Sequence, residues 1–147
     1  VAKMLEELPE EFHGEAGTPA GCDLFKIDEN SPEVDEKGAQ FCHTCVAKTL
    51  FTHERARPDS QTTVSFLCKR VKDCREDDHK KLKRTLQFMR ATKDDCLTLS
   101  AASLHNVSWW VDAARAAHPD VKSHTGGAMS LGTGVSCGTS TGQKLNA

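Results

Sequence analysis

The stretch that decides the second half of the fold is residues 108–127, Ser-Trp-Trp-Val-Asp-Ala-Ala-Arg-Ala-Ala-His-Pro-Asp-Val-Lys-Ser-His-Thr-Gly-Gly. Its first part is rich in aromatic and β-branched residues, which favour a strand, and the side chains of a strand alternate between two faces. Trp109 and Val111 therefore share one face, and Asp112 lies on the other. Because a carboxylate buried in a sheet is costly unless it binds a metal, meets a base or reaches water, Asp112 needs an explanation.

The alternating pattern continues on both sides of this stretch. After Lys93 the apolar residues stop recurring at helical spacing, and residues 96–99 and 106–113 are predicted to be strands. Residues 127–131 and 135–139 are predicted to form a hairpin around Gly132-Thr133-Gly134. The C-terminal part is thus expected to be an antiparallel sheet.

The preceding sequence has helical periodicity. Ser31-Pro32 predicts a helix start, with a helix over about 32–52, and Asp59 is expected to cap a second helix. A third helix should begin near Cys74, with an apolar stripe of Leu82, Leu86 and Met89. Its other side should face water or phosphate, because it carries Lys80, Lys83, Arg84, Gln87 and Arg90. Together with the strands, these helices predict an α+β fold.

Composition limits the class of protein. The chain has 147 residues, of which 37% are apolar and 27% charged, and no apolar run approaches the roughly 20 residues that cross a bilayer. The start, Val1-Ala2-Lys3-Met4, resembles neither an initiator methionine nor a signal peptide, so we expect a piece of a longer chain. Seven scattered cysteines do not form a secreted disulfide pattern. We therefore predict an intracellular protein, cytoplasmic or nuclear, with no membrane partner.

Charge is unevenly distributed along the chain. Residues 1–38 contain eleven acidic residues against three lysines, whereas residues 69–93 contain ten basic residues against four acidic ones. We interpret residues 1–30 as an acidic linker with few fixed contacts, and the basic block as a surface for a polyanion. The candidate nucleic-acid-binding residues are Lys69, Arg70, Lys72, Lys80, Lys83, Arg84 and Arg90.

Several motifs occur in a fixed order along most of the chain. They are Phe41-Cys42-His43-Thr44-Cys45-Val46-Ala47-Lys48, Arg55-Ala56-Arg57-Pro58-Asp59, Leu86-Gln87-Phe88-Met89-Arg90-Ala91-Thr92, Trp109-Trp110-Val111-Asp112 and Thr139-Ser140-Thr141-Gly142-Gln143-Lys144-Leu145-Asn146. In this order the chain resembles the pol polyprotein of copia-type LTR retrotransposons, from the end of the reverse transcriptase into RNase H.

The resemblance implies an organisation and an activity of the parent protein. Residues 31–95 would be a helical thumb and connection region that holds primer and template, and residues 96–147 a truncated RNase H-like domain containing its first strands. Asp112 would be the first-strand aspartate of the RNase H site, which binds magnesium (Mg²⁺) with further carboxylates. The implied partners are an RNA/DNA hybrid and the rest of the polyprotein, and the parent function is RNA-directed DNA synthesis with cleavage of the hybrid's RNA.

The chain is nevertheless expected to be catalytically incomplete. The paired aspartates of the polymerase and the later RNase H carboxylates of that family lie outside it, and two-metal hydrolysis needs several oxygen ligands that converge. Asp77-Asp78 and Asp94-Asp95 are interpreted as solvated charges. Residues 114 and 115, Ala-Arg, depart from the family pattern after Asp112. The expected function of the fragment is residual nucleic-acid binding.

Two alternatives remain open. The chain could be an inactive remnant without a function of its own, or a small intracellular zinc or interaction module built on Cys42 and Cys45. Buried thiols on a packed helix face explain this pair more simply. His118-Pro119-Asp120 is interpreted as a turn, and His124 as the entry to a strand.

Overall fold

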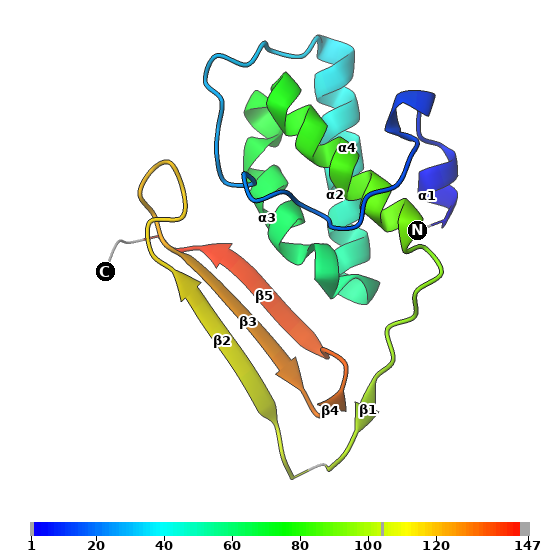
Figure 1. The fold of residues 1–147 in the computed structure, drawn as a ribbon, viewed down its shortest axis with the longest axis vertical. Coiled ribbons are helices and arrows are strands. Elements are labelled where there is room, and N and C mark those ends of the chain that lie inside the picture. Colours follow the sequence, from blue (N-terminus) through cyan, green and yellow to red (C-terminus); the bar gives the residue numbers. More distant parts are fainter. Residues whose placement is uncertain (1, 104, 145–147) are drawn as a thin grey trace.

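The computed structural model describes residues 2–103 and 105–144, and it confirms an α+β fold with antiparallel sheets. A helical part precedes a small sheet that lies beside it (Figure 1). The helical elements are α1 (Ala2–Glu6), α2 (Glu36–Ala56), α3 (Gln61–Arg70) and α4 (Glu76–Ala91), with short 3-10 turns at Glu10–Phe12, Pro58–Ser60 and Val71–Asp73. The strands are β1 (Ser100–Ala101), β2 (Ser108–Ala114), β3 (His124–Ser130), β4 (Gly132–Thr133) and β5 (Cys137–Gly142).

The first long helix begins later than predicted. Its N-cap is Asp35, whose carboxylate accepts a hydrogen bond from the Gly38 amide at 2.8 Å. The predicted start at Ser31-Pro32 is wrong because Glu33 forms an isolated β-bridge with Arg75, which keeps this part of the chain extended. The helix ends at Ala56, ahead of Pro58, as expected for a residue close before a proline.

The other two long helices occur where they were predicted, but with different caps. Asp59 does not cap α3, because its carboxylate accepts hydrogen bonds from the guanidinium of Arg57 at 2.7 to 3.2 Å. At the start of α4, Asp78 accepts a hydrogen bond from the Arg75 amide at 3.1 Å. A carboxylate in the first turn also interacts favourably with the helix dipole.

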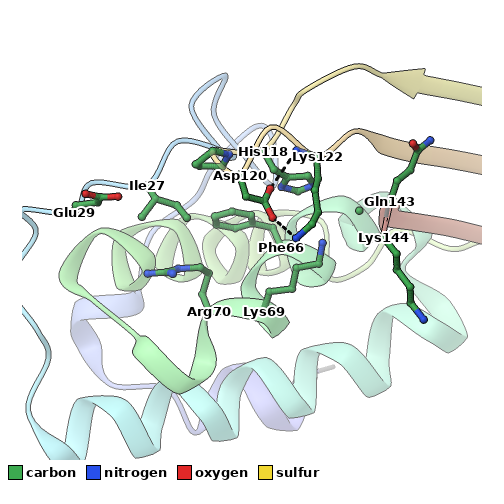
Figure 2. Close-up of a pocket in the computed structure, with 12 residues that line it drawn as sticks. Ile27, Glu29, Phe66, Lys69, Arg70, His118, Asp120, Lys122, Gln143 and Lys144 are labelled. Carbon is green, nitrogen blue, oxygen red and sulfur yellow. Dashed lines mark hydrogen bonds and ion pairs between the residues drawn. The ribbon is translucent and has the colours of Figure 1, made fainter. Parts of the chain in front are cut away.

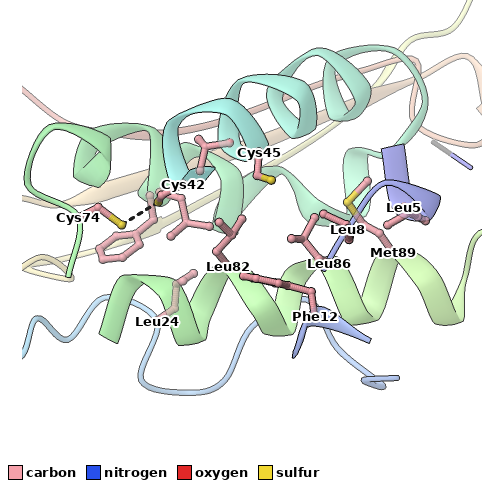
Figure 3. Close-up of a cluster of buried hydrophobic side chains, with 13 residues drawn as sticks. Leu5, Leu8, Phe12, Leu24, Cys42, Cys45, Cys74, Leu82, Leu86 and Met89 are labelled. Carbon is pink, nitrogen blue, oxygen red and sulfur yellow. Dashed lines mark hydrogen bonds between the residues drawn. The ribbon is translucent and has the colours of Figure 1, made fainter. Parts of the chain in front are cut away.

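The apolar stripe predicted on the third helix is confirmed as the centre of the core. Leu82, Leu86 and Met89 of α4 are fully buried, and Cys42, Cys45 and Val46 of α2 pack in the same cluster (Figure 3). Burial of such side chains is the main stabilising contribution to a small fold.

The N-terminal segment, residues 2–30, is not the loosely held linker that its acidity suggested. Leu5, Leu8, Phe12 and Leu24 are buried in the core cluster, and Figure 3 shows Phe12 and Leu24 beside α4. Backbone carbonyls of the segment also accept hydrogen bonds from α4: Arg90 donates to Leu5, Gln87 to His13 and Thr85 to Pro19. The prediction of few fixed contacts is therefore wrong, because four apolar side chains among the acids bind the segment to the helices.

The sheet has the strand order β2-β3-β5, with both pairings antiparallel. The predicted hairpin is confirmed as β3 and β5 with shifted bounds. The strand predicted over residues 96–99 is wrong: that stretch has no regular structure, and the short strand that follows, β1, pairs with β4. A Cβ at Gly132 would collide with the backbone of this short pairing, so a side chain would not fit there.

One face of the sheet is turned towards α3. The Ser140 hydroxyl donates to the hydroxyl of Thr62 at 3.1 Å, and a Cβ at Gly138 would meet the side chain of Gln61. Strand β2 lies at the opposite edge, and every residue in it is exposed. Trp109 is 60% exposed and Val111 73% exposed. The aromatic strand is thus an exposed sheet edge and not a core strand.

Candidate functional site

The predicted basic surface is divided between internal and solvent-facing roles. The guanidinium of Arg70 donates to the carboxylate of Asp78 at 3.1 Å, from both Nε and Nη2. The interpretation of Asp78 as a solvated charge is therefore wrong, because this carboxylate is buried and paired with Arg70. Arg84 and Arg90 donate hydrogen bonds to the N-terminal segment. These three arginines contribute to holding the fold together. The remaining predicted residues are exposed or half-buried: Lys69, Lys72, Lys80 and Lys83.

A cleft of about 670 Å³ lies between α3 and the end of the sheet (Figure 2). Three separate parts of the chain contribute basic side chains to it: α3, the loop between β2 and β3, and the residues after β5. Its charged lining consists of Lys69, Arg70, Lys122, Lys144, Glu29 and Asp120. Cations therefore outnumber carboxylates in the lining.

The charges in the cleft are paired to different degrees. Lys122 forms an ion pair with Asp120 at 2.5 Å, and this hydrogen-bonded contact lowers the pKa of the Asp120 carboxyl. Arg70 is held by Asp78 behind the cleft wall, and the hydrogen bond between them raises the pKa of the guanidinium. Lys69 has no carboxylate within 4.0 Å among residues 2–103 and 105–144. Lys144 also has no ion pair among these residues, so Lys69 and Lys144 are the cations of the cleft best placed to attract an anion.

Gly142, at the end of β5, lets Lys69 approach the sheet. A Cβ placed on Gly142 would collide with the Nζ atom of Lys69 and would lie 3.1 Å from Nε2 of His118. Any larger residue at this position would displace one of the two side chains. The absence of a side chain at Gly142 thus allows a lysine of α3 and a histidine of the loop to meet at the strand end.

Next to Lys69, four polar side chains are linked by a series of hydrogen bonds. The Nε2 atom of His118 lies 2.9 Å from Nδ1 of His124, and Nε2 of His124 lies 2.7 Å from the Ser140 hydroxyl. Because Ser140 donates to Thr62, a neutral His124 satisfies both contacts by donating from Nε2 and accepting at Nδ1. His118 then donates from Nε2, and its Nδ1 atom carries a lone pair.

Both imidazoles are in the neutral form at neutral pH. Burial lowers the pKa of His118, and the nearby Lys69 ammonium lowers it further. Burial also lowers the pKa of His124, with additional contributions from His118 and Lys69. His124 and Ser140 are buried and do not line the cleft, so they fix the orientation of His118, which does. The interpretation of His118-Pro119-Asp120 as a turn is confirmed by the Val121 amide, which donates to the His118 carbonyl at 2.9 Å.

Asp112 lies away from this cleft, in the middle of β2. Its side chain is exposed, and one carboxylate oxygen accepts a hydrogen bond from the Ala113 amide at 2.8 Å. Contact with water therefore accounts for a carboxylate in this strand. Its partner across the sheet is Gly126, which in turn pairs with Ser140. These neighbours supply no second carboxylate, so the described residues of the sheet do not assemble a magnesium site by themselves.

The cysteines of the alternative zinc site lie inside the helical part. Cys42 and Cys45 are both buried on α2, and burial raises the pKa of the Cys45 thiol to about 11. In the part of the chain that the structure describes, three or more His, Cys, Asp or Glu side chains do not gather as a metal-binding group.

The residues of the cleft could be identified only in part from the sequence. Lys69 and Arg70 belong to the predicted basic block, whereas Lys122, Lys144 and His118 come from segments 48 or more positions away in the chain. Nothing in the sequence of the basic block indicated that these segments lie next to α3 in the fold. The last two residues of the C-terminal motif, Leu145 and Asn146, lie outside the described residues.

Comparisons with protein-family models, curated proteins and solved structures found no match for this chain. Among the described helices, none has both the length and the apolar character needed to cross a membrane.

Proposed function

We propose that the cleft beside α3 binds the phosphate backbone of a nucleic acid, and that the chain is a fragment of a copia-type retrotransposon pol polyprotein. The observation that supports binding most directly is the convergence of Lys69, Lys122 and Lys144 from three separate segments on one cleft. The family assignment rests on the order of motifs in the sequence. The two parts of the proposal can be tested separately.

The chemistry of the cleft favours phosphate over a base edge as the group that is bound. A lysine ammonium is a compact point charge with three donors and no fixed plane, so it neutralises a phosphate without reading sequence. The nearby His118 is neutral and adds no repulsive or attractive charge at neutral pH. Binding should therefore be independent of sequence and should weaken steeply as salt concentration rises.

In the parent polyprotein the ligand would be an RNA/DNA hybrid, and the activities would be RNA-directed DNA synthesis and RNase H cleavage. Asp112 would contribute one magnesium ligand there, with the other carboxylates supplied by parts of the polyprotein beyond the described sheet. We assign no catalytic step to this chain alone. Its proposed partners are the hybrid and the remaining pol segments, in the cytoplasm or the nucleus.

The binding proposal is tested by fluorescence anisotropy with a labelled RNA/DNA hybrid over a series of salt concentrations. Lys69→Gln and Lys122→Gln should each weaken binding, and each should reduce the slope of log K against log salt by about 0.9. The matched control is Lys37→Gln, which removes an exposed lysine of α2 that does not line the cleft.

Two results would contradict the proposal. Affinity for the hybrid that is insensitive to salt would exclude backbone binding by lysines. Equal losses in Lys69→Gln and Lys37→Gln would show that the cleft has no special role. If the wild-type chain does not bind the hybrid at all, the interpretation as an inactive remnant is favoured. Stoichiometric zinc in the purified protein would favour the third interpretation, a zinc module.

A further inference from the structure

Two buried sulfur atoms in the helical part lie closer together than unbonded atoms of this size normally do. The Sγ atoms of Cys42 and Cys74 are 2.7 Å apart, and Figure 3 shows the two side chains pointing at each other. Cys42 comes from the second turn of α2, and Cys74 from the extended residue just before α4. The separation is intermediate between ordinary contact and the bond length of a disulfide, about 2.05 Å.

The geometry points to a reversible disulfide between Cys42 and Cys74, which would make this pair a redox modification site. The inference does not depend on the proposed nucleic-acid function. The two residues are separated by 32 positions, so the bond would join α2 to the start of α4 across the core.

The surroundings of the pair assign different roles to the two sulfurs. The hydrogen bond with Cys42 lowers the pKa of Cys74, and the neighbouring Arg70 guanidinium lowers it further. The same hydrogen bond, together with burial, raises the pKa of Cys42. Cys74 is 6% exposed and Cys42 1% exposed. Cys74 is thus the more accessible of the two and, with the Arg70 guanidinium beside it, is the better placed to react first.

We take a small disulfide such as glutathione disulfide as the oxidant. The differences between the two cysteines then determine which thiol reacts first. The Cys74 thiolate attacks one sulfur of the oxidant, forms a mixed disulfide and releases one glutathione thiolate, which takes up a proton. Cys42 then loses its proton to water, attacks Sγ of Cys74 and releases the second glutathione thiolate. Two protein thiols are oxidised, and one external disulfide is reduced to two thiols.

A nearby cysteine provides a matched control. Cys45 lies one turn further along the same helix, is also buried, and has no sulfur partner among the described residues. A bond that formed merely because a buried thiol is present would involve Cys45 as well. A bond set by geometry should involve Cys42 only.

The test is to incubate the full chain in glutathione redox buffers, to alkylate free thiols in denaturant and to digest with trypsin. The expected product joins peptides 38–48 and 73–75 and lacks two hydrogen atoms relative to the reduced pair. Peptide 38–48 contains both Cys42 and Cys45. The link should therefore persist in Cys45→Ala and disappear in Cys42→Ala.

Thermal unfolding supplies a second readout. The melting temperature of the wild type and of Cys45→Ala should be several degrees higher in the oxidised than in the reduced form, whereas Cys42→Ala should show no such difference. The inference is overturned if the oxidised wild type retains alkylatable Cys42 and Cys74, or if the link persists in Cys42→Ala. The peptide map of the wild type is informative even if a variant does not fold.

Discussion

The imidazoles of His118 and His124 share one hydrogen bond, in which Nε2 of His118 lies 2.9 Å from Nδ1 of His124. Only one of the two facing nitrogens can carry a proton while the bond persists. One added proton can be accommodated without breaking the bond, but protonation of both rings would place two N–H donors against each other, so the contact excludes the doubly protonated pair. The arrangement makes the end of the sheet sensitive to acid.

The stability of the fold should fall as the pH is lowered below about 6.5, the ordinary pKa of histidine. The pKa values of His53, His118 and His124 are all lowered in the fold, chiefly by burial. Below their ordinary pKa the unfolded chain therefore binds more protons than the folded one. Each such histidine should reduce the free energy of unfolding by at most about 1.4 kcal/mol per pH unit, down to its lowered pKa.

Urea denaturation between pH 8 and pH 5 measures this dependence. His124→Gln should flatten the curve, because it removes one of the three groups. His43→Gln should leave the curve unchanged, since His43 is exposed on α2. A free energy of unfolding that rises as the pH falls from 7 to 5 would show that these histidines gain protons on folding, contrary to the burial seen here.

Arg70→Ala should destabilise the protein by roughly 3 kcal/mol, because it leaves the buried Asp78 carboxylate without its guanidinium partner. Asp78 would still accept the Arg75 amide hydrogen bond, which keeps the loss below that of a fully isolated charge. Lys72→Ala, two residues away and exposed, is the control and should change stability by less than about 0.5 kcal/mol. Equal effects of the two substitutions, measured by urea denaturation, would mean that the ion pair adds nothing to stability.

Phe12→Ala should destabilise the protein by roughly 3 kcal/mol, as expected for removing a fully buried ring. The ring of Phe12 packs against Phe41 at a centroid distance of 4.8 Å and against His79 at 5.0 Å. The neighbouring substitution Glu11→Ala removes an exposed side chain and should have little effect on the denaturation midpoint. If Phe12→Ala were equally mild, the N-terminal segment would behave as the linker that its composition suggested.

Val111→Lys should reduce self-association without loss of stability. Val111 is 73% exposed on β2, a strand with a sheet partner on one side only among the described strands. Exposed apolar edge strands pair readily with other chains, and a lysine at the edge prevents this. Light scattering over a range of protein concentrations should show less association for Val111→Lys than for the wild type. Thr44→Lys, at an exposed position of helix α2 and away from both sheet edges, is the control and should leave association unchanged.

The parts of the fold that depend on local periodicity were predictable. The stripe of Leu82, Leu86 and Met89 predicted both the helix and its buried side, because spacing along a helix fixes which residues share a face. The sheet was predictable from the alternation around Asp112 and the glycine-rich hairpin, whereas the strand expected at 96–99 did not form. That stretch has the side chains of a strand but no neighbouring strand to pair with.

The parts that depend on contacts between distant segments were not predictable. Residues 1–30 contain eight acidic residues against two lysines, which suggested a linker, yet burial of Leu5, Leu8 and Phe12 determines where the segment lies. Likewise, the sequence indicated Lys69 as a cation but not that His118 would meet it at Gly142. These contacts depend on how the sheet packs on α3, and the local sequence pattern does not predict that packing.

The position of the N-terminal segment has a consequence for the order of folding. Its buried side chains pack against α4, which ends at Ala91, so its native contacts span most of the helical part. During synthesis these residues emerge before α4 but acquire their contacts only after α4 has left the ribosome. Contacts of such long sequence separation form late. We therefore expect the segment to dock last during refolding and its backbone amides to exchange with solvent before those of α2 and α4.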